Sequence, residues 1–300
     1  MTNRSAVKLG LFLARSLGTR NGYRVSKWIA DLISNQKGAN VVKAVRANQR
    51  VIRDNSLSEQ QLDEAVKAVF RHAGRCTIDL YGNFTDVHKL DSLMAHTAET
   101  DLLIEFSNKK DQGGTIIAIP HQSNFDLVLI ALGINGFNTQ VLTYAQPSEV
   151  YRMQNDVRAK SGVEITPISE SVLIKSIRRL KAGGTIVTGI DRPDPNAKHP
   201  LNFFGYPALL PTGHIRLALA TGAVIRIAAI QLFQDEKYHL LLSDPIEMTH
   251  HPDPEQQLRI NGEKVLQKLE YYLRLAPEQW LMYYPVWPNF IPVSSNANGL

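Results

Sequence analysis

The chain has 300 residues, of which 44% are hydrophobic, and a formal net charge of +5. This length allows one large domain or two small ones, and the apolar content is enough for a full core. The longest apolar runs are far shorter than the roughly 18 residues of a membrane-spanning helix. Cys76 is the single cysteine, which excludes an intrachain disulfide and fits a reducing compartment. His250 and His251 lack partners at metal spacing, so we expect a polar loop and no metal site.

Basic residues are concentrated in residues 1–53, which hold 11 lysines and arginines and one acid, Asp31. The stretches LGLFLARSL and VSKWIADLI in this segment place apolar residues at helical spacing between basic ones. Such a helix suits an anionic membrane surface, and the alternative is a helix that packs on the core with its charges in solvent. The apolar stretch 9–14 is too short for a signal peptide. Nucleic acid is not expected as a partner, because the sequence lacks the aromatic–basic interleaving of single-strand binders.

The rest of the chain alternates predicted helices and strands. The stretch SLSEQQLDEAVKAVFRHAG predicts a helix in which Ser58 and Gln61 form a capping box. Strands are expected at 115–120, 139–144, 185–190, 223–230 and 238–242, and helices at 169–182, 213–221 and 255–275. This order predicts an α/β fold with a mainly parallel central sheet flanked by helices and a helical N-terminal segment. We expect a single domain over 1–292, with membrane-associating helices in 1–53, and a disordered tail at 293–300.

The stretch IPHQSNFDLVLIAL places His121 and Asp126 where a strand ends and a helix begins. Active sites of α/β proteins gather beyond the carboxyl ends of their strands. A histidine can take the proton of a hydroxyl, and a carboxylate on its other ring nitrogen fixes the tautomer. Alternatively, Ser123 is the N-cap of the helix and Asp126 completes a capping box, and the two roles can coexist.

The signatures of several other enzyme classes are absent from the sequence. It contains no G-x-S-x-G elbow, no Walker motif and no Rossmann G-x-G-x-x-G motif. If His121 is a base, we therefore expect the nucleophile to come from the substrate.

The segment from His121 to Asp126 resembles the H-x4-D motif of the glycerolipid (lysophospholipid) acyltransferase superfamily. The block 189–230, with IDRPDP, FFG, LPTG and TGA, resembles the branch of lipid A late acyltransferases and phosphatidylinositol mannoside acyltransferases. The C-terminal APEQW and the N-terminal VVKAVRANQRVI are similar to the same branch. The resemblance runs in order through most of the chain, and these blocks together are far more specific than H-x4-D alone.

This resemblance implies transfer of a fatty acyl chain from acyl-CoA or acyl carrier protein to a hydroxyl of a membrane glycolipid or polar lipid. It implies neither an acyl-enzyme nor a metal or bound cofactor. His121 would be the general base, and Asp126 its orienting partner or only a helix cap. Asp191 matches an acidic strand-end position that is a glutamate paired with the histidine in the mannoside branch, although an ordinary acidic turn is the alternative. Arg192 would pair with Asp191 or bind a phosphate.

Further residues are candidates for substrate binding. Arg152 and Arg158 match a segment that binds phosphate in this superfamily, and a solvated helix face is the alternative. Thr212 and Gly213 open a helix whose free N–H groups suit an anion or an oxyanion, unless Thr212 simply caps the helix. The remaining candidates are Asn124 for a substrate oxygen and, for an acyl groove, Phe203, Phe204, Tyr206 and Leu209.

Departures from the superfamily pattern narrow the expected substrate. The strand ending TGIDRP replaces the Glu-Gly-Thr-Arg-type phosphate motif of the glycerol-3-phosphate branch, which favours a glycolipid acceptor. Since no membrane-spanning helix is predicted, we expect a peripheral enzyme on the cytoplasmic face of the cell membrane. Two alternatives remain: a glycerol-type lysophospholipid acyltransferase, and a non-catalytic lipid-binding protein on the same fold.

Overall fold

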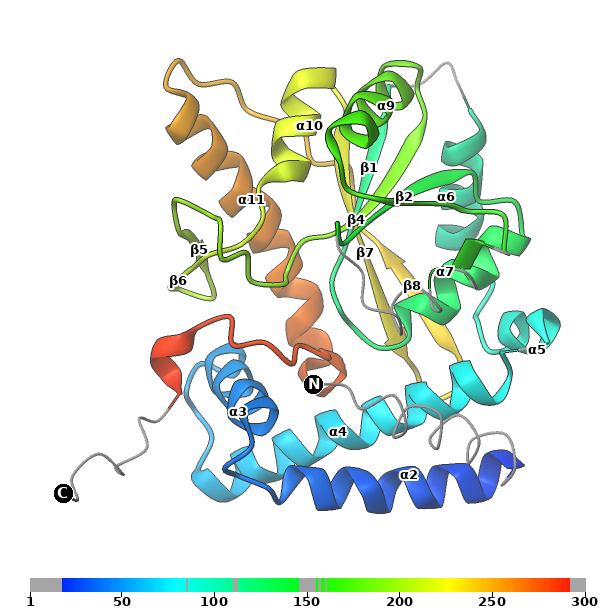
Figure 1. The fold of residues 1–300 in the computed structure, drawn as a ribbon, viewed down its shortest axis with the longest axis vertical. Helices are drawn as coiled ribbons and strands as arrows, with labels where there is room; N and C mark the ends of the chain where they lie inside the picture. The colour runs from blue at the N-terminus through cyan, green and yellow to red at the C-terminus, as the bar shows by residue number, and fades with distance from the viewer. Residues whose placement is uncertain are drawn as a thin grey trace.

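The computed structural model describes residues 18–84, 86–109, 113–145, 155, 158–159 and 161–291. Within these residues, a six-stranded sheet has the order β3-β2-β4-β1-β7-β8, and its neighbours are parallel except for β7 and β8 (Figure 1). Its strands are β1 (Thr115–Ile119), β2 (Thr139–Thr143), β3 (Glu164–Pro167), β4 (Thr185–Gly189), β7 (Val224–Leu232) and β8 (Tyr238–Leu242). The predicted α/β fold with a mainly parallel sheet and a helical N-terminal segment is confirmed.

The two faces of the sheet bury alternate residues of each strand, as the two-residue period of a strand requires. In β1, Ile116 and Ala118 join one buried cluster, and Ile117 joins the cluster on the opposite face. The first cluster includes residues of α9 (Glu170–Lys181), α10 (Gly213–Thr221) and α11 (Pro254–Leu275), and the second includes residues of α6 (Ala98–Asn108) and α7 (Phe125–Ile134). Helices therefore cover both faces of the sheet. The loops that follow the parallel strands meet at the carboxyl ends of those strands.

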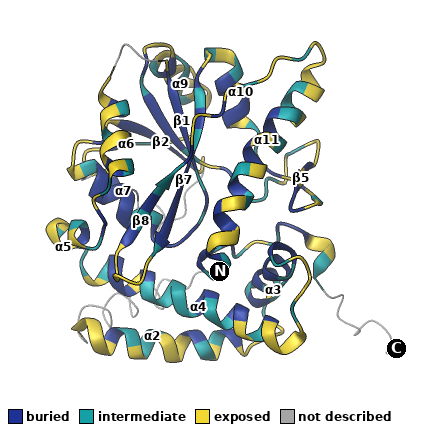
Figure 2. Cartoon of the chain, turned by 180° about the vertical axis from the view of Figure 1, so that it is seen from behind, coloured by how far each residue is buried: buried dark blue, intermediate teal, exposed yellow. Residues whose placement is uncertain are grey.

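The N-terminal helices form a separate layer below the sheet in Figure 1. This layer consists of α2 (Gly18–Ser34), α3 (Asn40–Ile52) and α4 (Glu59–Gly82). The axes of α2 and α4 approach closely because both contribute a glycine, Gly22 facing Ile78 and Gly74 facing Ser26. Figure 2 shows that the outward side of α2 is largely exposed. The preceding residues of the predicted membrane-associating segment, 1–17, lie outside the described residues.

Local sequence patterns predicted most of these helices and strands. Ser58 caps α4 through the predicted capping box with Gln61, so that prediction is confirmed. The five expected strands and three expected later helices are all present with shifts of at most a few residues. The sequence did not predict β3 or the small antiparallel sheet of β5 (Leu201–Phe203) and β6 (Tyr206–Ala208). The shorter elements are α5 (Val87–Ser92) and the 3-10 helices η1 (Pro277–Gln279) and η2 (Pro288–Phe290).

Three further expectations concern membrane spans, the C-terminal tail and the pair of adjacent histidines. In the described part of the chain, none of the helices has the length and apolar character needed to cross a membrane. The predicted disordered tail, 293–300, lies outside the described residues. His250 and His251 lie in the irregular segment that precedes α11, as expected.

Candidate active site

His121 and Asp191 meet because two neighbouring parallel strands end at the same level. Ile119 of β1 is paired with Gly189 of β4, and each polar residue follows its strand end by two positions. The imidazole Nδ1 of His121 lies 2.6 Å from Oδ1 of Asp191. The backbone N–H of His121 donates to Oδ2 of the same carboxylate at 2.8 Å. The carboxylate therefore holds both the ring and the backbone of His121, and it leaves Nε2 as the reactive nitrogen.

The C-terminal segment supplies a further hydrogen-bond donor to Asp191. Trp280, just after η1, donates its indole N–H to Oδ2 of Asp191 at 2.7 Å. The same segment pairs with the loop after β1: the N–H of Leu281 donates to the carbonyl of His121 at 2.8 Å, and the N–H of Ser123 donates to the carbonyl of Gln279 at 2.7 Å. The similarity of the APEQW segment to the family did not predict a role for Trp280. Its hydrogen bond to Asp191 is visible only in the structure.

Burial and hydrogen bonding shift the pKa of Asp191 in opposite directions. Its side chain is fully buried, and burial alone would raise its pKa. The His121 imidazole, the indole N–H of Trp280 and the backbone N–H of His121 outweigh this effect, so the pKa of Asp191 lies below its ordinary value. The carboxylate is therefore ionised at neutral pH, where it can fix the His121 tautomer and stabilise an imidazolium.

Replacing Trp280 with phenylalanine should lower any His121-dependent turnover roughly tenfold or more, since a hydrogen bond to a charged group contributes about 1.5–3 kcal/mol. Trp287→Phe is the matched control, because the buried indole N–H of Trp287 has no hydrogen-bond partner within the described residues. Both variants remove an indole from the same aromatic cluster, in which the two rings lie 6.2 Å apart. Steady-state kcat distinguishes them, and equal losses would show that Trp280 contributes packing alone.

Asp126 does not occupy the expected position beside His121. Its carboxylate accepts a hydrogen bond from Nε of Arg158 at 2.8 Å. The predicted capping box is also wrong: α7 begins at Phe125 with Asn124 as N-cap, and no side chain caps it. Ser123 adopts a left-handed backbone, with a φ of 48°, which is incompatible with the extended conformation of an N-cap.

Of the other predicted binding residues, Arg158 and Arg192 lie together beside His121, where both line the same cavity. Asn124 is buried and donates to the backbone carbonyl of Cys76 at 3.0 Å, so this N–H is used structurally and not for a substrate. Arg192 lies between two tyrosine rings, 4.1 Å from the centroid of Tyr284 and 5.5 Å from that of Tyr144. It makes no ion pair with Asp191 or with any other carboxylate of the described residues. Arg152 lies outside the described residues.

The helix that begins at Gly213 was expected to present free N–H groups to a substrate. Its first residues do not line the cavity beside His121, although the preceding Pro211 does. The hydroxyl of Thr212 makes no capping hydrogen bond either. Thr212 is nevertheless the N-cap residue of α10, the position that the alternative to an anion site predicted.

The aromatic residues expected to form an acyl groove belong to the core instead. Phe203 and Phe204 are buried and pack against each other and against Trp287. Tyr206 contacts Phe290, and the side chain of Leu209 is exposed. None of the four lines the cavity at His121, because the β5–β6 hairpin turns toward α11 and away from the strand ends.

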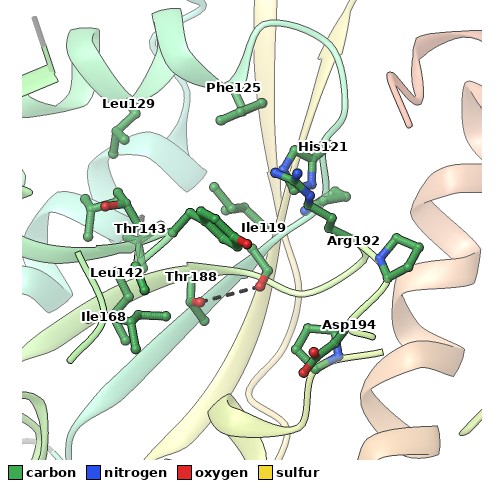
Figure 3. A pocket seen from close by; sticks show the side chains of 18 of the residues that line it. Ile119, His121, Phe125, Leu129, Leu142, Thr143, Ile168, Thr188, Arg192 and Asp194 are labelled. Atoms are coloured by element: carbon green, nitrogen blue, oxygen red, sulfur yellow. Dashed lines mark hydrogen bonds between the residues drawn. The ribbon is translucent and has the colours of Figure 1, made fainter. Parts of the chain in front are cut away.

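A cavity of about 340 Å³ opens beside His121 at the carboxyl ends of β1, β2 and β4 (Figure 3). Its apolar wall is formed by residues of β1, β2 and β4, of α7, and of the short connection between β3 and α9. Residues of this wall are Ile119, Phe125, Leu129, Val141, Leu142, Ile168 and Val187. Arg192 and Asp194 form a polar rim at the other side (Figure 3), and Asn196 also lines the cavity. The cavity thus combines an apolar interior with the imidazole of His121.

Comparison with known proteins assigns the chain to a family. The model of the bacterial lipid A biosynthesis acyltransferase family matches residues 2–288. The chain belongs to this family. The resemblance read from its sequence blocks is therefore confirmed.

Individual relatives match over a shorter stretch. A phosphatidylinositol mannoside acyltransferase from Mycobacterium tuberculosis (strain CDC 1551 / Oshkosh) is 28% identical over 119 residues, which cover 37% of this chain and 37% of the relative. The protein of the same name from Mycolicibacterium smegmatis is 29% identical over 119 residues, or 37% of this chain and 38% of the relative. The chain is thus aligned with little more than a third of each relative's length.

Proposed function

We propose that this protein is an O-acyltransferase that moves a fatty acyl chain from a thioester to a hydroxyl of a membrane glycolipid or related polar lipid. The observation that carries this proposal is the pairing of His121 with the buried, ionised Asp191 at the edge of an apolar cavity. Membership of the lipid A biosynthesis acyltransferase family supports the same reaction class.

The chemistry requires one base that later acts as an acid. Nε2 of His121 takes the proton of the acceptor hydroxyl as its oxygen attacks the thioester carbonyl, and Asp191 stabilises the resulting imidazolium. When the tetrahedral intermediate collapses, the C–S bond breaks and the thiolate leaves. The imidazolium then protonates the thiolate, which restores neutral His121. No covalent acyl-enzyme is needed, because the acceptor itself is the nucleophile.

The apolar cavity provides the place for the acyl chain in this mechanism. Its wall includes Phe125, Leu129 and Val187, which also border a small, wholly apolar cavity inside the core. Hydrocarbon removed from water contributes about 0.8 kcal/mol per buried methylene, so a fatty chain gains most by extending along this wall. The thioester carbonyl would then lie near His121, with the carrier, either coenzyme A or acyl carrier protein, toward solvent.

The names of the relatives favour a glycolipid acceptor. They are named for the acylation of phosphatidylinositol mannoside, and the family for lipid A biosynthesis, so both acceptor types combine a sugar with a membrane lipid. The strand-end sequence TGIDRP points the same way, because it lacks the phosphate motif of the glycerol-3-phosphate branch.

We also propose that α2 binds an anionic membrane surface, which would place the enzyme peripherally on the cytoplasmic face. Trp28 is 63% exposed and Leu32 46% exposed, and the basic side chains of Arg24 and Lys27 are exposed on the same helix. The only acid of α2, Asp31, is neutralised by a bidentate pair with Arg71, at 2.6 and 2.8 Å. An exposed apolar strip flanked by exposed cations suits the interface of an anionic bilayer.

Replacing both Trp28 and Leu32 with serine should therefore reduce pelleting with phosphatidylglycerol vesicles at low salt at least severalfold. The matched control replaces Tyr271 and Leu275, which are similarly exposed on α11, with serine. Sedimentation of each variant with vesicles measures the bound fraction. Unchanged pelleting of the α2 variant, or an equal loss in the α11 variant, would contradict a docking role for α2.

The reaction class is tested by lipid mass spectrometry. Purified protein is incubated with palmitoyl-CoA, or with palmitoyl-acyl carrier protein, and a polar-lipid extract of the source organism. A lipid heavier by one palmitoyl group supports the proposal, and its headgroup separates a glycolipid from a glycerol-type lysophospholipid product. Binding of lipid without a new product from either donor would instead support a non-catalytic lipid-binding protein.

A further inference from the structure

The turn that follows His121 contains a residue with an unfavourable backbone conformation. Ser123, two residues after His121 and one before the N-cap of α7, has a φ of 48°. A residue with a β-carbon rarely adopts this left-handed conformation, and it keeps it only where neighbouring groups hold it. One such contact comes from the backbone, because the N–H of Ser123 donates to the carbonyl of Gln279 at 2.7 Å. A second contact involves the serine side chain.

The side chain of Ser123 contacts a histidine of α4. Its hydroxyl lies 2.9 Å from Nε2 of His72, which comes 51 positions earlier in the chain. Ser123 is buried, and the thiol of Cys76 lies 3.4 Å from the same ring nitrogen. His72 does not line the cavity beside His121, so its connection to the candidate base runs through the turn.

The imidazole of His72 is neutral at physiological pH. Burial lowers the pKa of His72 to about 4, and the positive charge of Arg75 acts in the same direction. A neutral imidazole has one N–H donor and one acceptor nitrogen, and a hydroxyl can complement either of them at Nε2. The contact with Ser123 is therefore a hydrogen bond between neutral groups. It holds the turn without placing a further charge beside His121.

The stretch of α4 around this histidine is firmly attached to its neighbours. The side chain of Asn124 donates to the backbone carbonyl of Cys76 at 3.0 Å. Further along the helix, the buried carboxylate of Asp79 accepts hydrogen bonds from Tyr23 of α2 and Tyr238 of β8. Figure 1 shows α4 between α2 and the sheet. The helix is thus a fixed support from which the imidazole can hold the turn.

The orientation of His121 depends on this turn. Its N–H donates to Asp191, and its carbonyl accepts from the N–H of Leu281, so its backbone is held on the side of the sheet and the C-terminal segment. One residue separates this fixed point from Ser123. A change of the backbone at Ser123 would therefore tilt His121 and disturb the 2.6 Å contact between its ring and Asp191.

We propose that His72 is a positioning residue for His121. Its hydrogen bond to Ser123 keeps the turn after β1 in the left-handed conformation that directs the imidazole of His121 onto Asp191. This inference rests on the proposed role of His121 as the base, and it gives the N-terminal helical layer a part in the geometry of the active site.

The hydrogen bond is tested with two amide substitutions of different length. In His72→Gln the amide reaches about as far as Nε2 and can still pair with Ser123, whereas the shorter amide of His72→Asn ends near the position of Nδ1. His88→Asn is the matched control, because His88 is exposed on α5. For each variant and the unmodified protein, kcat and the KM for palmitoyl-CoA are measured in the acyl-transfer assay. The temperature is one at which circular dichroism shows every protein folded.

A second measurement reports on His121 without any substrate. The proton in the hydrogen bond between Nδ1 of His121 and Asp191 gives a downfield NMR resonance, because it is shared with a carboxylate. The resonance is assigned by its absence from His121→Ala and is then recorded for the His72 and His88 variants. A role of His72 in packing alone would leave it unchanged.

We expect His72→Asn to lower kcat roughly tenfold or more, because a small misplacement of a reacting group is costly, and to change KM less than about twofold. It should also move the resonance upfield or broaden it. His72→Gln should retain at least about a third of kcat together with the resonance, and His88→Asn should change neither.

Two results would overturn the proposal: equal losses of kcat in His72→Gln and His72→Asn, or an unchanged resonance in His72→Asn. Absence of transfer by the unmodified protein would instead contradict the proposed function. The resonance alone would then decide whether His72 positions the ring of His121.

Discussion

Replacing His121 with alanine should lower kcat/KM for acyl transfer by at least about 100-fold, since general base catalysis contributes roughly 10²–10⁴. The variant retains Asp191 and the apolar cavity, but it has lost the imidazole that takes the proton of the acceptor hydroxyl. The measurement is the rate of acylated lipid formation from palmitoyl-CoA, followed by mass spectrometry. Removal of the imidazole should leave palmitoyl-CoA binding nearly unchanged, because His121 lines the cavity only at its edge.

A loss of folding would imitate this result, so the variant needs a stability control. His121 is partly exposed, with 31% of its side chain accessible, and alanine at this position creates no enclosed cavity. The buried Asp191 carboxylate nevertheless loses its imidazole partner, so the thermal midpoint is expected to fall, and the rates are compared at a temperature at which circular dichroism shows both proteins folded. A folded His121→Ala protein that retains more than a third of the rate would rule out His121 as the base.

Replacing Asp191 with asparagine should lower kcat on the order of 10³-fold, because the amide cannot stabilise the imidazolium and permits the wrong tautomer. Asp126→Asn is the matched control: it makes the same chemical change on a carboxylate in the same region that pairs with Arg158 and not with the ring. We expect less than a tenfold loss of kcat for it. Equal small losses in both variants would mean that neither carboxylate is the catalytic partner of His121.

Asp191→Asn should also change the pH dependence of stability. Since the pKa of Asp191 is lowered in the folded protein, its ionised form contributes stability above the ordinary carboxyl value of about 4. That contribution is lost as the pH falls through the lower, folded pKa. Asp191→Asn should therefore flatten the acid side of the curve of unfolding free energy against pH, as measured by urea denaturation. An unchanged acid limb would contradict the ionised state assigned to Asp191.

Much of the fold was predictable because its signals are local. Strand periodicity located β1, β2 and β4, and the Ser58 cap fixed the start of α4. The missed β3 is a short strand of four residues at the edge of the sheet. None of these residues is fully buried, so its sequence shows no strong pattern of apolar residues. The β5–β6 hairpin was missed for a related reason: its strands are three residues long and end in a turn at Gly205.

The sequence by itself determined the α/β class, the position of His121 at a strand end and the family to which the chain belongs. It left Asp126 and Asp191 as equal candidates for the partner of His121, since spacing along the chain carries no information on strand order. Only the tertiary structure places β4 next to β1 in a register that brings Asp191 to the imidazole, 70 positions away in sequence. The same holds for the cavity walls. Phe203 and Phe204 look like ligand contacts in the sequence, but packing against α11 and Trp287 buries them, and residues of β1, β2, β4 and α7 line the cavity beside His121 instead.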